Sequence, residues 1–453
     1  MSYQSLVARA LANAFAIGPW EAVRLRELGE AVLGEAVHGT RPRWLTPLVR
    51  AVLREFPSPP EDDEAVLQVA AFIVRRRSFL RAFYREHPPQ VVRWLFRPPA
   101  MGTSPWPVPP AATLVELAQL LEVEVRRLEW FADTRRYLQR AASPWLDHYH
   151  REWLPKRSGG YRLIEIPKPL IKAAQRRVLQ RILDHIPAHE SAEGFVRGRS
   201  PLSHAQRHVG RDAVLCLDLE DFFTSIPYGR VFRVFRAAGY PLPVARALAG
   251  LCTTSLPIAA LASMPRPRLA TELPRHERMR RNALRQHLPQ GAPTSPALAN
   301  LCAFGLDRRL SSAARVAGLG YSRYADDLTF SGAGDFARRA PSFATLAAGI
   351  ALDEGFDVNF RKTRLMRAAT RQIVCGVVVN AHPNVPRDDY DRLKAILTNC
   401  QRHGAQSQNR EAHADFHSHL RGRVAWVEKL APARGAKLLA LFERIDWASA
   451  SGG

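Results

Sequence analysis

The sequence is poor in cysteine and in long apolar runs. Five cysteines, Cys216, Cys252, Cys302, Cys375 and Cys400, are spread through 453 residues without a CxxC pair. This spacing argues against structural zinc and a disulfide framework and favours a reducing compartment, so we expect a cytoplasmic location. No run of about 18 apolar residues could span a membrane, and the N-terminus lacks the features of a secretory signal. We therefore expect no membrane partner.

Acidic residues are scarce relative to basic ones. The chain has 65 Lys and Arg against 42 Asp and Glu, giving a formal net charge of +23. Such an excess attracts polyanions, and nucleic acid is the commonest polyanion inside cells. The charge alone does not separate an enzyme from a passive nucleic-acid binder. The length allows two to four domains, each able to bury a core.

Three segments precede the central part of the chain. Apolar residues recur at helical spacing within residues 1–97, which predicts an N-terminal helical extension. Residues 98–111 are rich in proline, which cannot continue a helix, so we predict a stiff linker. Residues 112–147 are expected to be helical and to lead into the next domain. They open with Thr113 and Glu116 in a capping-box pattern.

The pattern changes to short β-rich runs alternating with helices over residues 148–380. Helices are expected at 172–186 and 296–316. The predicted strands are 161–166, 213–217, 320–324, 328–330 and 373–379. This mixture predicts an α+β domain with an antiparallel sheet. Residues 381–453 return to basic, helical sequence.

The first motif with chemical content is an acidic residue at the end of an apolar strand. Asp218 directly follows the apolar run 213–217, and for that reason we prefer it to Glu220 and Asp221 as a functional carboxylate. A carboxylate held at a sheet edge can face a cleft. An acidic strand end is also commonly a solvated turn, so this motif alone decides little.

The second motif is a pair of adjacent carboxylates, Asp326 and Asp327, in Tyr-Ala-Asp-Asp between two apolar strands. Two neighbouring carboxylates at a tight turn repel each other unless a cation lies beside them. The alternative is a solvated surface hairpin.

The two acidic motifs together indicate a site for metal-assisted phosphoryl transfer. Transfer to a nucleotide commonly uses two metal ions about 3.5–4 Å apart. Mg²⁺ prefers hard oxygen ligands, so we expect Asp218 and Asp326 to bridge two Mg²⁺ ions, with Asp327 in support. Zinc is unlikely on a set made only of carboxylates.

Two further motifs could contact a nucleotide. In Leu-Pro-Gln-Gly-Ala-Pro-Thr-Ser-Pro, Gly291 permits close backbone approach, so Gln290 and Gly291 could lie against a nucleotide or template. A proline-rich surface loop is the alternative. Lys156 and Arg162 flank a Gly-Gly turn in a basic hairpin and could clamp a triphosphate. The alternative here is a solvated basic hairpin.

These four motifs, in this order, resemble the reverse transcriptase family, and within it the bacterial retron type. The resemblance covers about residues 125–400. It implies a right-hand polymerase fold, with fingers and an antiparallel palm over residues 148–380 and a helical thumb over 381–453. It also implies that Asp218, Asp326 and Asp327 are metal ligands.

Further roles follow from the same resemblance. Phe223, five residues after Asp218, matches the sugar-gate position, where an aromatic ring blocks a ribonucleotide 2′-hydroxyl. Lys362 lies in what looks like the next palm motif and would act near the leaving pyrophosphate. Arg421 and Arg423, in the basic thumb region, would bind RNA.

The chain departs from the retron pattern at two places. Where retron enzymes carry Asn-Ala-x-x-His, this sequence has His204-Ala-Gln-Arg-His208, and where they carry Val-Thr-Gly it has Val374-Cys-Gly376.

The expected function is an RNA-directed DNA polymerase that uses dNTPs to copy a dedicated structured noncoding RNA into DNA, in antiphage defence with an effector protein. One alternative is a defence polymerase with another priming route, such as protein priming. The other is an inactive RNA-binding scaffold.

An Arg-rich segment, residues 257–287, lies between the first two palm motifs and looks like an insertion. Its arginines are Arg266, Arg268, Arg275, Arg278, Arg280, Arg281 and Arg285. It could contact nucleic acid or be a solvated loop. His148 and His150, before the basic hairpin, are expected to serve packing or phosphate contacts and not to bind metal.

Overall fold

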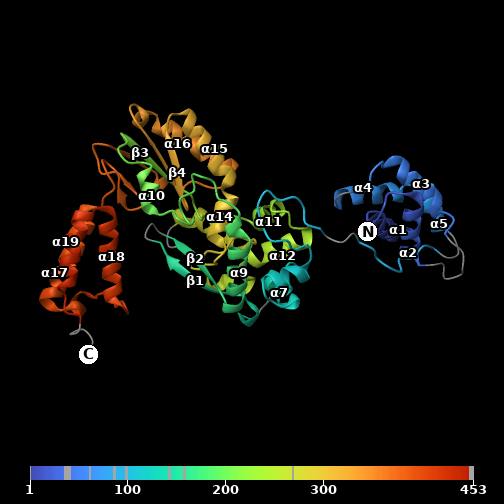
Figure 1. Cartoon of the computed structure of the whole chain (residues 1–453), viewed down its shortest axis with the longest axis horizontal. Helices are drawn as coiled ribbons and strands as arrows, with labels where there is room; N and C mark the ends of the chain where they lie inside the picture. The colour runs from blue at the N-terminus through green and yellow to red at the C-terminus, as the bar shows by residue number, and fades with distance from the viewer. Residues whose placement is uncertain are drawn as a thin grey trace. The chain divides into compact units, whose positions relative to one another are not determined.

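The computed structural model describes residues 2–34, 42–60, 63–84, 88–96, 100–140, 144–156, 160–267 and 270–447. The chain forms two compact units, Met1–Ala100 and Met101–Gly453 (Figure 1). The division falls close to the predicted end of the N-terminal extension. Within the described residues, no helix is both long enough and apolar enough to cross a membrane.

The first unit is helical around its own core. Its described helices are α1 (Tyr3–Phe15), α2 (Ala22–Leu33), α3 (Leu45–Glu55), α4 (Asp63–Val74) and α5 (Arg77–Ala82). Leu11, Phe15, Leu45 and Phe79 are fully buried between them. The amphipathic spacing seen in the sequence therefore buries one face of each helix against the others.

The prediction of helix as far as residue 97 is wrong for residues 88–96, which contain no helix. Pro88 and Pro89 lack a backbone N–H, and proline is unfavourable inside a helix. The extended segment lies along α2 instead, where the N–H groups of Val92 and Arg93 donate to the carbonyl of Val32 at 2.9 and 3.1 Å.

The proline-rich segment is docked on the second unit. Residues 97–99 lie outside the described residues, and residues 100–112 contain no helix, as the prolines predict. The N–H of Gly102 donates to the carbonyl of Gly239 at 2.7 Å, and Tyr240 Oη donates to the carbonyl of Pro109 at 2.9 Å. Ala111 is fully buried in the main core. The segment is therefore part of the second unit and not a free spacer.

Residues 114–140 contain three helices, as expected for this part of the predicted helical segment. These are α6 (Leu114–Leu120), α7 (Val125–Ala132) and α8 (Tyr137–Arg140). Thr113 Oγ1 accepts from the N–H of Glu116 at 3.1 Å, and Glu116 Oε2 accepts from the N–H of Ala112 at 2.7 Å. These two bonds satisfy N–H groups at the start of α6, as the capping pattern predicts.

The basic hairpin forms as predicted. Strands β1 (Tyr149–Pro155) and β2 (Tyr161–Pro167) are antiparallel, with Pro155 opposite Tyr161. Residues 157–159 of the predicted Gly-Gly turn lie outside the described residues. Helix α9 (Pro169–Arg181) follows, shorter than the predicted 172–186 because a 3₁₀ turn at Leu183–His185 ends it.

The palm sheet has four strands in the order β4-β5-β3-β6, each antiparallel to its neighbours. These strands are β3 (Ala213–Asp218), β4 (Gly320–Tyr324), β5 (Asp327–Gly332) and β6 (Arg364–Arg367). Side chains alternate between the two faces of a strand. Accordingly, Leu215 and Leu217 enter the main core, while Val214 and Cys216 enter a second core shared with the C-terminal helices.

Five helices share the main core with the sheet. Of these, α15 (Phe304–Val316) and α16 (Phe336–Asp353) pack against its strands. The others, α11 (Tyr228–Ala237), α12 (Leu242–Cys252) and α14 (Ser295–Cys302), lie further along the same core. The single helix predicted at 296–316 is divided into α14 and α15 at Ala303. Both α14 and α15 are helical, and each buries its own apolar face in the main core.

The predicted strand 373–379 is wrong as a single strand. It is a small hairpin of β7 (Ile373–Val374) and β8 (Val377–Val378). Cys375 and Gly376 form its turn with φ angles of 45° and 81°. Positive φ at both central residues suits a tight hairpin turn. The sequence predicts one continuous strand here because residues on both sides of Cys375 are apolar.

The C-terminal region is helical as predicted. It contains α17 (Arg387–His403), α18 (Phe416–Leu430) and α19 (Pro432–Glu443), which lie together in Figure 1. Their inner face includes Leu397, Leu420, Val424 and Leu438, all fully buried. The five cysteines, each within the described residues, are free thiols.

Candidate active site

The palm sheet brings the three predicted carboxylates to one end. Asp218 is the last residue of β3 and lies directly opposite Asp327, the first residue of β5. Asp326 is in the turn before Asp327, and its carbonyl accepts from the N–H of Leu219 at 2.9 Å. Antiparallel pairing thus joins segments more than 100 residues apart in sequence.

Two of the three carboxylates, Asp326 and Asp327, have a raised pKa. Burial, and then the charge of Asp218, raise the pKa of Asp326. Burial, followed by the charges of Asp326 and Asp218, raises the pKa of Asp327 to about 6. A cluster of partly buried carboxylates with raised pKa values is an environment that a cation stabilises.

Lys362 forms an ion pair with Asp218. Its Nζ is 2.8 Å from Asp218 Oδ1, and the N–H of Asn359 donates to the carbonyl of Asp218 at 2.7 Å. As the side chains lie, the described residues contain no group of three or more His, Cys, Asp or Glu close enough to hold a metal ion. The donor set, three carboxylates, nevertheless matches the hard oxygen ligands that Mg²⁺ prefers.

The basic hairpin reaches the same region through Lys156. Its Nζ is 2.9 Å from Asp221 Oδ1, three residues after Asp218. Arg162, on β2, is exposed. Its positive charge is one of those that lower the pKa of Asp326, against the larger effect of burial. Arg162 therefore acts on the acidic cluster, whereas Lys156 pairs with the neighbouring Asp221.

Phe223 belongs to an aromatic group beside the carboxylate turn. The ring of Phe195 is 6.0 Å from that of Phe223 and 6.5 Å from that of Tyr324. Phe195 is 48% exposed and has a φ of 63°. Phe195 carries no signal in the sequence, because only the tertiary fold places it next to Phe223.

The Gln290–Gly291 loop packs against the basic hairpin. The carbonyl of Gln290 accepts from the N–H of Glu165 in β2 at 2.9 Å. Gly291 has a φ of 135°, and a Cβ there would lie 2.7 Å from the carbonyl oxygen of Glu165. The expected close backbone approach at Gly291 is thus made to the protein's own strand β2.

The two histidines of the altered retron motif are buried. His208 bonds to Ser331 Oγ through Nδ1 and to Ser322 Oγ through Nε2, both at 2.8 Å. His204 Nδ1 is also 2.8 Å from Ser322 Oγ. Burial lowers the pKa of each histidine to about 3. The motif therefore attaches α10 (Pro201–Gln206) to the palm sheet.

His148 has a packing role, as expected. It is buried, and its Nε2 is 2.9 Å from the carbonyl of Trp130. His150 is exposed on β1.

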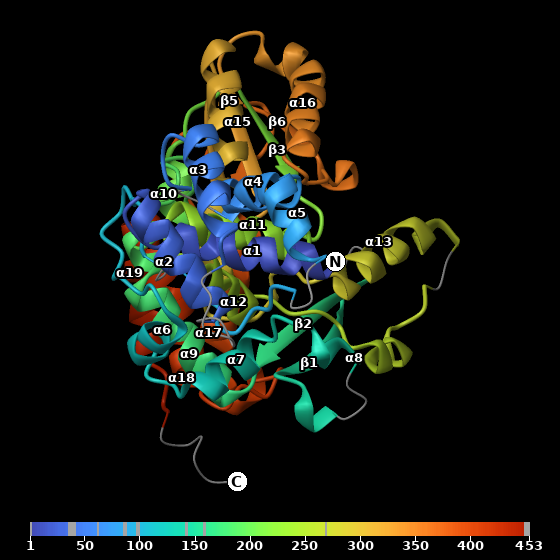
Figure 2. The same ribbon diagram turned by 90° about the vertical axis from the view of Figure 1, so that its right-hand side faces the viewer.

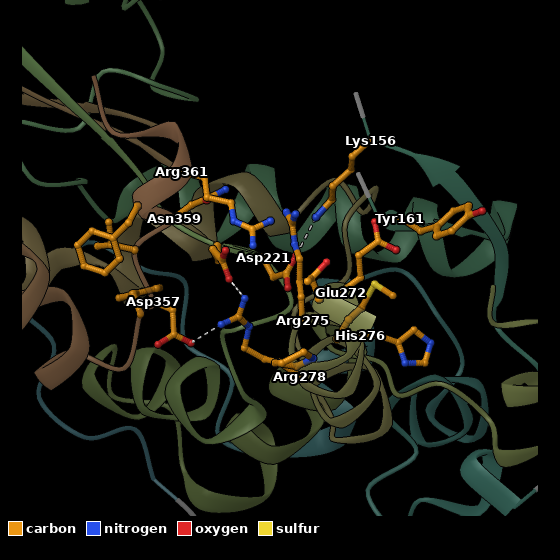
Figure 3. Close-up of a pocket in the computed structure, with 18 of the residues that line it drawn as sticks. Lys156, Tyr161, Asp221, Glu272, Arg275, His276, Arg278, Asp357, Asn359 and Arg361 are labelled. Carbon is orange, nitrogen blue, oxygen red and sulfur yellow. Dashed lines mark hydrogen bonds and ion pairs between the residues drawn. The ribbon is translucent and has the colours of Figure 1, made fainter. Parts of the chain in front are cut away.

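A cavity of about 780 Å³ opens beside Lys156 and Asp221 (Figure 3). One wall comes from the Arg-rich segment, which contains helix α13 (Leu273–Leu284) and two 3₁₀ turns. Arg278 of α13 pairs with Glu220, and its Nη1 is 3.7 Å from Asp357 Oδ2. Figure 2 shows α13 on the same side of the second unit as the β1–β2 hairpin. Arg268 lies outside the described residues.

The two arginines predicted to bind RNA lie on α18. Arg421 Nη1 is 2.8 Å from Glu428 Oε2, so its charge is partly compensated. Arg423 lines a smaller cavity with Tyr390 and Trp426. The two side chains therefore have different surroundings, although they are close in sequence.

Comparison with known proteins decides the family. The model of the family described as "Reverse transcriptase (RNA-dependent DNA polymerase)" matches residues 154–400, more than half of the chain. The chain belongs to the reverse transcriptase family. The α+β polymerase fold expected from the sequence is confirmed, and members of the family generally use divalent metal ions.

Several curated relatives are retron enzymes. The Mx65 reverse transcriptase of Myxococcus xanthus is 42% identical over 298 residues, covering 64% of this chain and 63% of the relative. The Mx162 enzyme of the same organism is 37% identical, covering 73% and 66%. The Ec86 enzyme of Escherichia coli is 31% identical, covering 52% and 64%. The matches thus span less than two thirds of these relatives, and they identify the bacterial retron type.

A solved structure of the foamy viral protease–reverse transcriptase in complex with double-stranded DNA is also similar. It has a TM-score of 0.37 and 15% identity, covering 89% of this chain and 56% of that chain.

Proposed function

We propose that the protein is an RNA-directed DNA polymerase that copies RNA into DNA by metal-assisted phosphoryl transfer. The observation that carries the proposal is the meeting of Asp218, Asp326 and Asp327 at one end of the palm sheet. These carboxylates would hold two Mg²⁺ ions. Bound there, the ions would activate the primer 3′-hydroxyl and neutralise the leaving pyrophosphate.

The surrounding residues would hold the incoming dNTP. Lys156 and Arg162 would bind its triphosphate, and Phe223 would lie under its sugar. Gln290 and Gly291, which contact β2, would lie against the incoming nucleotide or the template. Lys362, now paired with Asp218, would act near the pyrophosphate. The adjoining cavity of about 780 Å³ is within the usual size range for small-molecule sites.

The direct test is primer extension on an RNA template with Mg²⁺ and dNTPs. Changing Asp326→Ala and Asp327→Ala together should abolish synthesis without unfolding the chain, because the change removes charge repulsion as well as ligands. A matched control changes Asp388→Ala and Asp389→Ala, another adjacent pair, in the first turn of α17. That variant should still extend the primer.

Retained incorporation in the Asp326/Asp327 variant would refute the assignment of the site. An inactive wild-type protein that still binds RNA would favour the scaffold alternative.

We also propose that the template is a structured noncoding RNA encoded beside the gene and that the DNA product serves antiphage defence in the cytoplasm, with an effector protein. The similarity to retron enzymes and the basic α18 support this. Structured RNA is read mainly through shape and 2′-hydroxyl contacts, which Arg421 and Arg423 could make.

RNA crosslinked to the protein in native cells should be dominated by one locus-encoded species. That species should resist unrelated competitor RNA at about 0.2 M salt, where non-specific phosphate binding weakens steeply. A broad mixture of cellular RNAs, all displaced by competitor, would refute this template and favour another priming route.

A further inference from the structure

Arg323 is a fully buried arginine two residues before the carboxylate turn. Its guanidinium is held by Asp307 of α15, itself fully buried, with Nε–Oδ1 at 2.8 Å and Nη2–Oδ2 at 2.5 Å. Burial alone would lower the pKa of Arg323, but the charge and hydrogen bonds of Asp307 raise it above its usual value. The side chain is therefore a fixed cation inside the palm.

One guanidinium nitrogen reaches the turn itself. Arg323 Nη1 donates to the carbonyl of Ala325 at 2.9 Å and to Asn300 Oδ1 at 3.0 Å. Ala325 directly precedes Asp326 and has a φ of 56°, a left-handed conformation that is unfavourable for alanine. Such a conformation persists only where the surrounding structure holds it.

A second close contact to the turn comes from Gly194. A Cβ at Gly194 would lie 2.6 Å from the backbone N of Ala325, so residue 194 packs directly on the turn. Asn300, the second ligand of the guanidinium, donates from Nδ2 to the carbonyl of Gly194 at 2.8 Å. Asn300 thus connects the two groups that contact Ala325, which are the Arg323 guanidinium and Gly194.

A buried ion pair of this kind is a weak source of stability, because removing both charges from water is costly. Its geometric effect is specific, however. The bidentate contact with Asp307 fixes the plane of the guanidinium, which in turn fixes the position of the Ala325 carbonyl.

We propose that Arg323 is a positioning residue: its guanidinium, oriented by Asp307 and Asn300, holds the turn so that the carboxylates of Asp326 and Asp327 face Asp218. The inference rests on the proposed function of these carboxylates. Arg323 touches neither substrate nor ion and acts only through Ala325.

The test requires variants that remain folded. Arg323→Met alone would leave the charge of Asp307 buried and unpaired, which is strongly destabilising. The double variant Arg323→Met with Asp307→Asn removes both charges and keeps an oxygen that can accept from Tyr321 Oη, now 2.8 Å from Asp307 Oδ1. Arg323→Lys is a milder variant that keeps the charge but loses the planar fork.

Binding of Mn²⁺ to the full-length protein, followed by electron paramagnetic resonance, gives a readout that does not require activity. Groups that orient metal ligands typically affect metal affinity or activity by about 10- to 100-fold. We expect a loss of that size in Mn²⁺ affinity and in kcat for the double variant, with a smaller loss for Arg323→Lys. The KM for dNTP should change little, because Lys156 and Arg162 lie on the separate β1–β2 hairpin.

The matched control is Arg309→Met. Arg309 also lies on α15 and pairs with two carboxylates, Asp353 and Glu354 at 2.8 and 3.1 Å, but it is partly exposed and does not contact the turn. The Arg309→Met variant should have the Mn²⁺ affinity and kcat of the wild type.

A folded double variant with wild-type Mn²⁺ affinity would overturn the inference. If the double variant does not fold, wild-type affinity in Arg323→Lys would overturn it equally. A wild-type chain that binds Mn²⁺ but extends no primer would refute the proposed function, while loss of Mn²⁺ binding in the Arg323 variants would still support the positioning role. A wild-type chain that binds no Mn²⁺ would refute both.

Discussion

Phe223 follows Asp218 by five residues, and its ring contacts those of Phe222 and Phe195. If it lies under the sugar of the incoming nucleotide, Phe223→Val should open space for a 2′-hydroxyl. We expect the variant to use rNTPs more readily relative to dNTPs, measured as the ratio of kcat/KM for the two substrates. The change should come from the rNTP, because the dNTP has no 2′-hydroxyl to accommodate.

Phe304→Val is a suitable control for this prediction, since Phe304 is a partly exposed phenylalanine on α15 that contacts His189. Its rNTP/dNTP ratio should stay at the wild-type value. An unchanged ratio in an active Phe223→Val variant would mean that another residue, such as the neighbouring Phe195, discriminates the sugar.

Some of these residues could be found from sequence and others could not. Asp218, Asp326 and Asp327 follow or precede apolar strands, so their local pattern places them at strand ends. Phe195 and Arg323 carry no such signal. Arg323 is an ordinary basic residue in sequence, and only the packing of α15 against β4 shows that it is buried on Asp307.

At the level of elements, β6 (Arg364–Arg367) was missed, but the other three palm strands were predicted because their apolar runs are bounded by polar residues. The extended segment 88–96 and the hairpin β7–β8 were not. The conformation of the segment 88–96 depends on its backbone partner, since the carbonyl of Val32 accepts two of its N–H groups. The hairpin depends on its turn, since a positive φ at Cys375 divides the strand into β7 and β8. Apolar periodicity does not report either feature.

The attachment of α10 to the palm sheet should weaken in acid. His204 and His208 have folded-state pKa values of about 3 because burial disfavours their charged forms, whereas an unfolded histidine has a pKa of about 6.5. Below about pH 6.5 the unfolded state therefore binds protons that the folded state does not. Stability is fully present above that pH and is lost as the pH falls toward 3, by up to about 1.4 kcal/mol per pH unit for each histidine.

Hydrogen exchange of peptides from α10 and β4, measured at pH 7 and pH 5 and corrected for intrinsic rates, would report this loss. His204→Asn removes one titrating group and restores the Asn of the retron pattern, so its stability should fall less steeply with acid. Equal pH dependence in the variant and the wild type would show that His204 does not govern the effect.

At the level of the whole molecule, the two units have separate buried cores. The second unit contains the palm, the basic hairpin and the C-terminal helices, and residues 101–112 already pack into it. Deleting residues 1–100 should therefore leave a folded protein with an unchanged melting temperature for the second unit. Thermal unfolding by circular dichroism would measure this, and aggregation or a large fall in melting temperature would contradict it.

The chemistry of the cysteines has a practical consequence for studying the two units. Burial raises the pKa of Cys216 to about 11, and those of Cys252, Cys302 and Cys375 to about 12; the pKa of Cys400 is raised as well. The thiolate is the form that alkylating reagents attack, so the native thiols should react slowly at neutral pH. A fluorophore pair attached to cysteines introduced at the exposed positions Val23 and Val316 would then label these two sites selectively, and energy transfer between them would measure the distance between the two units.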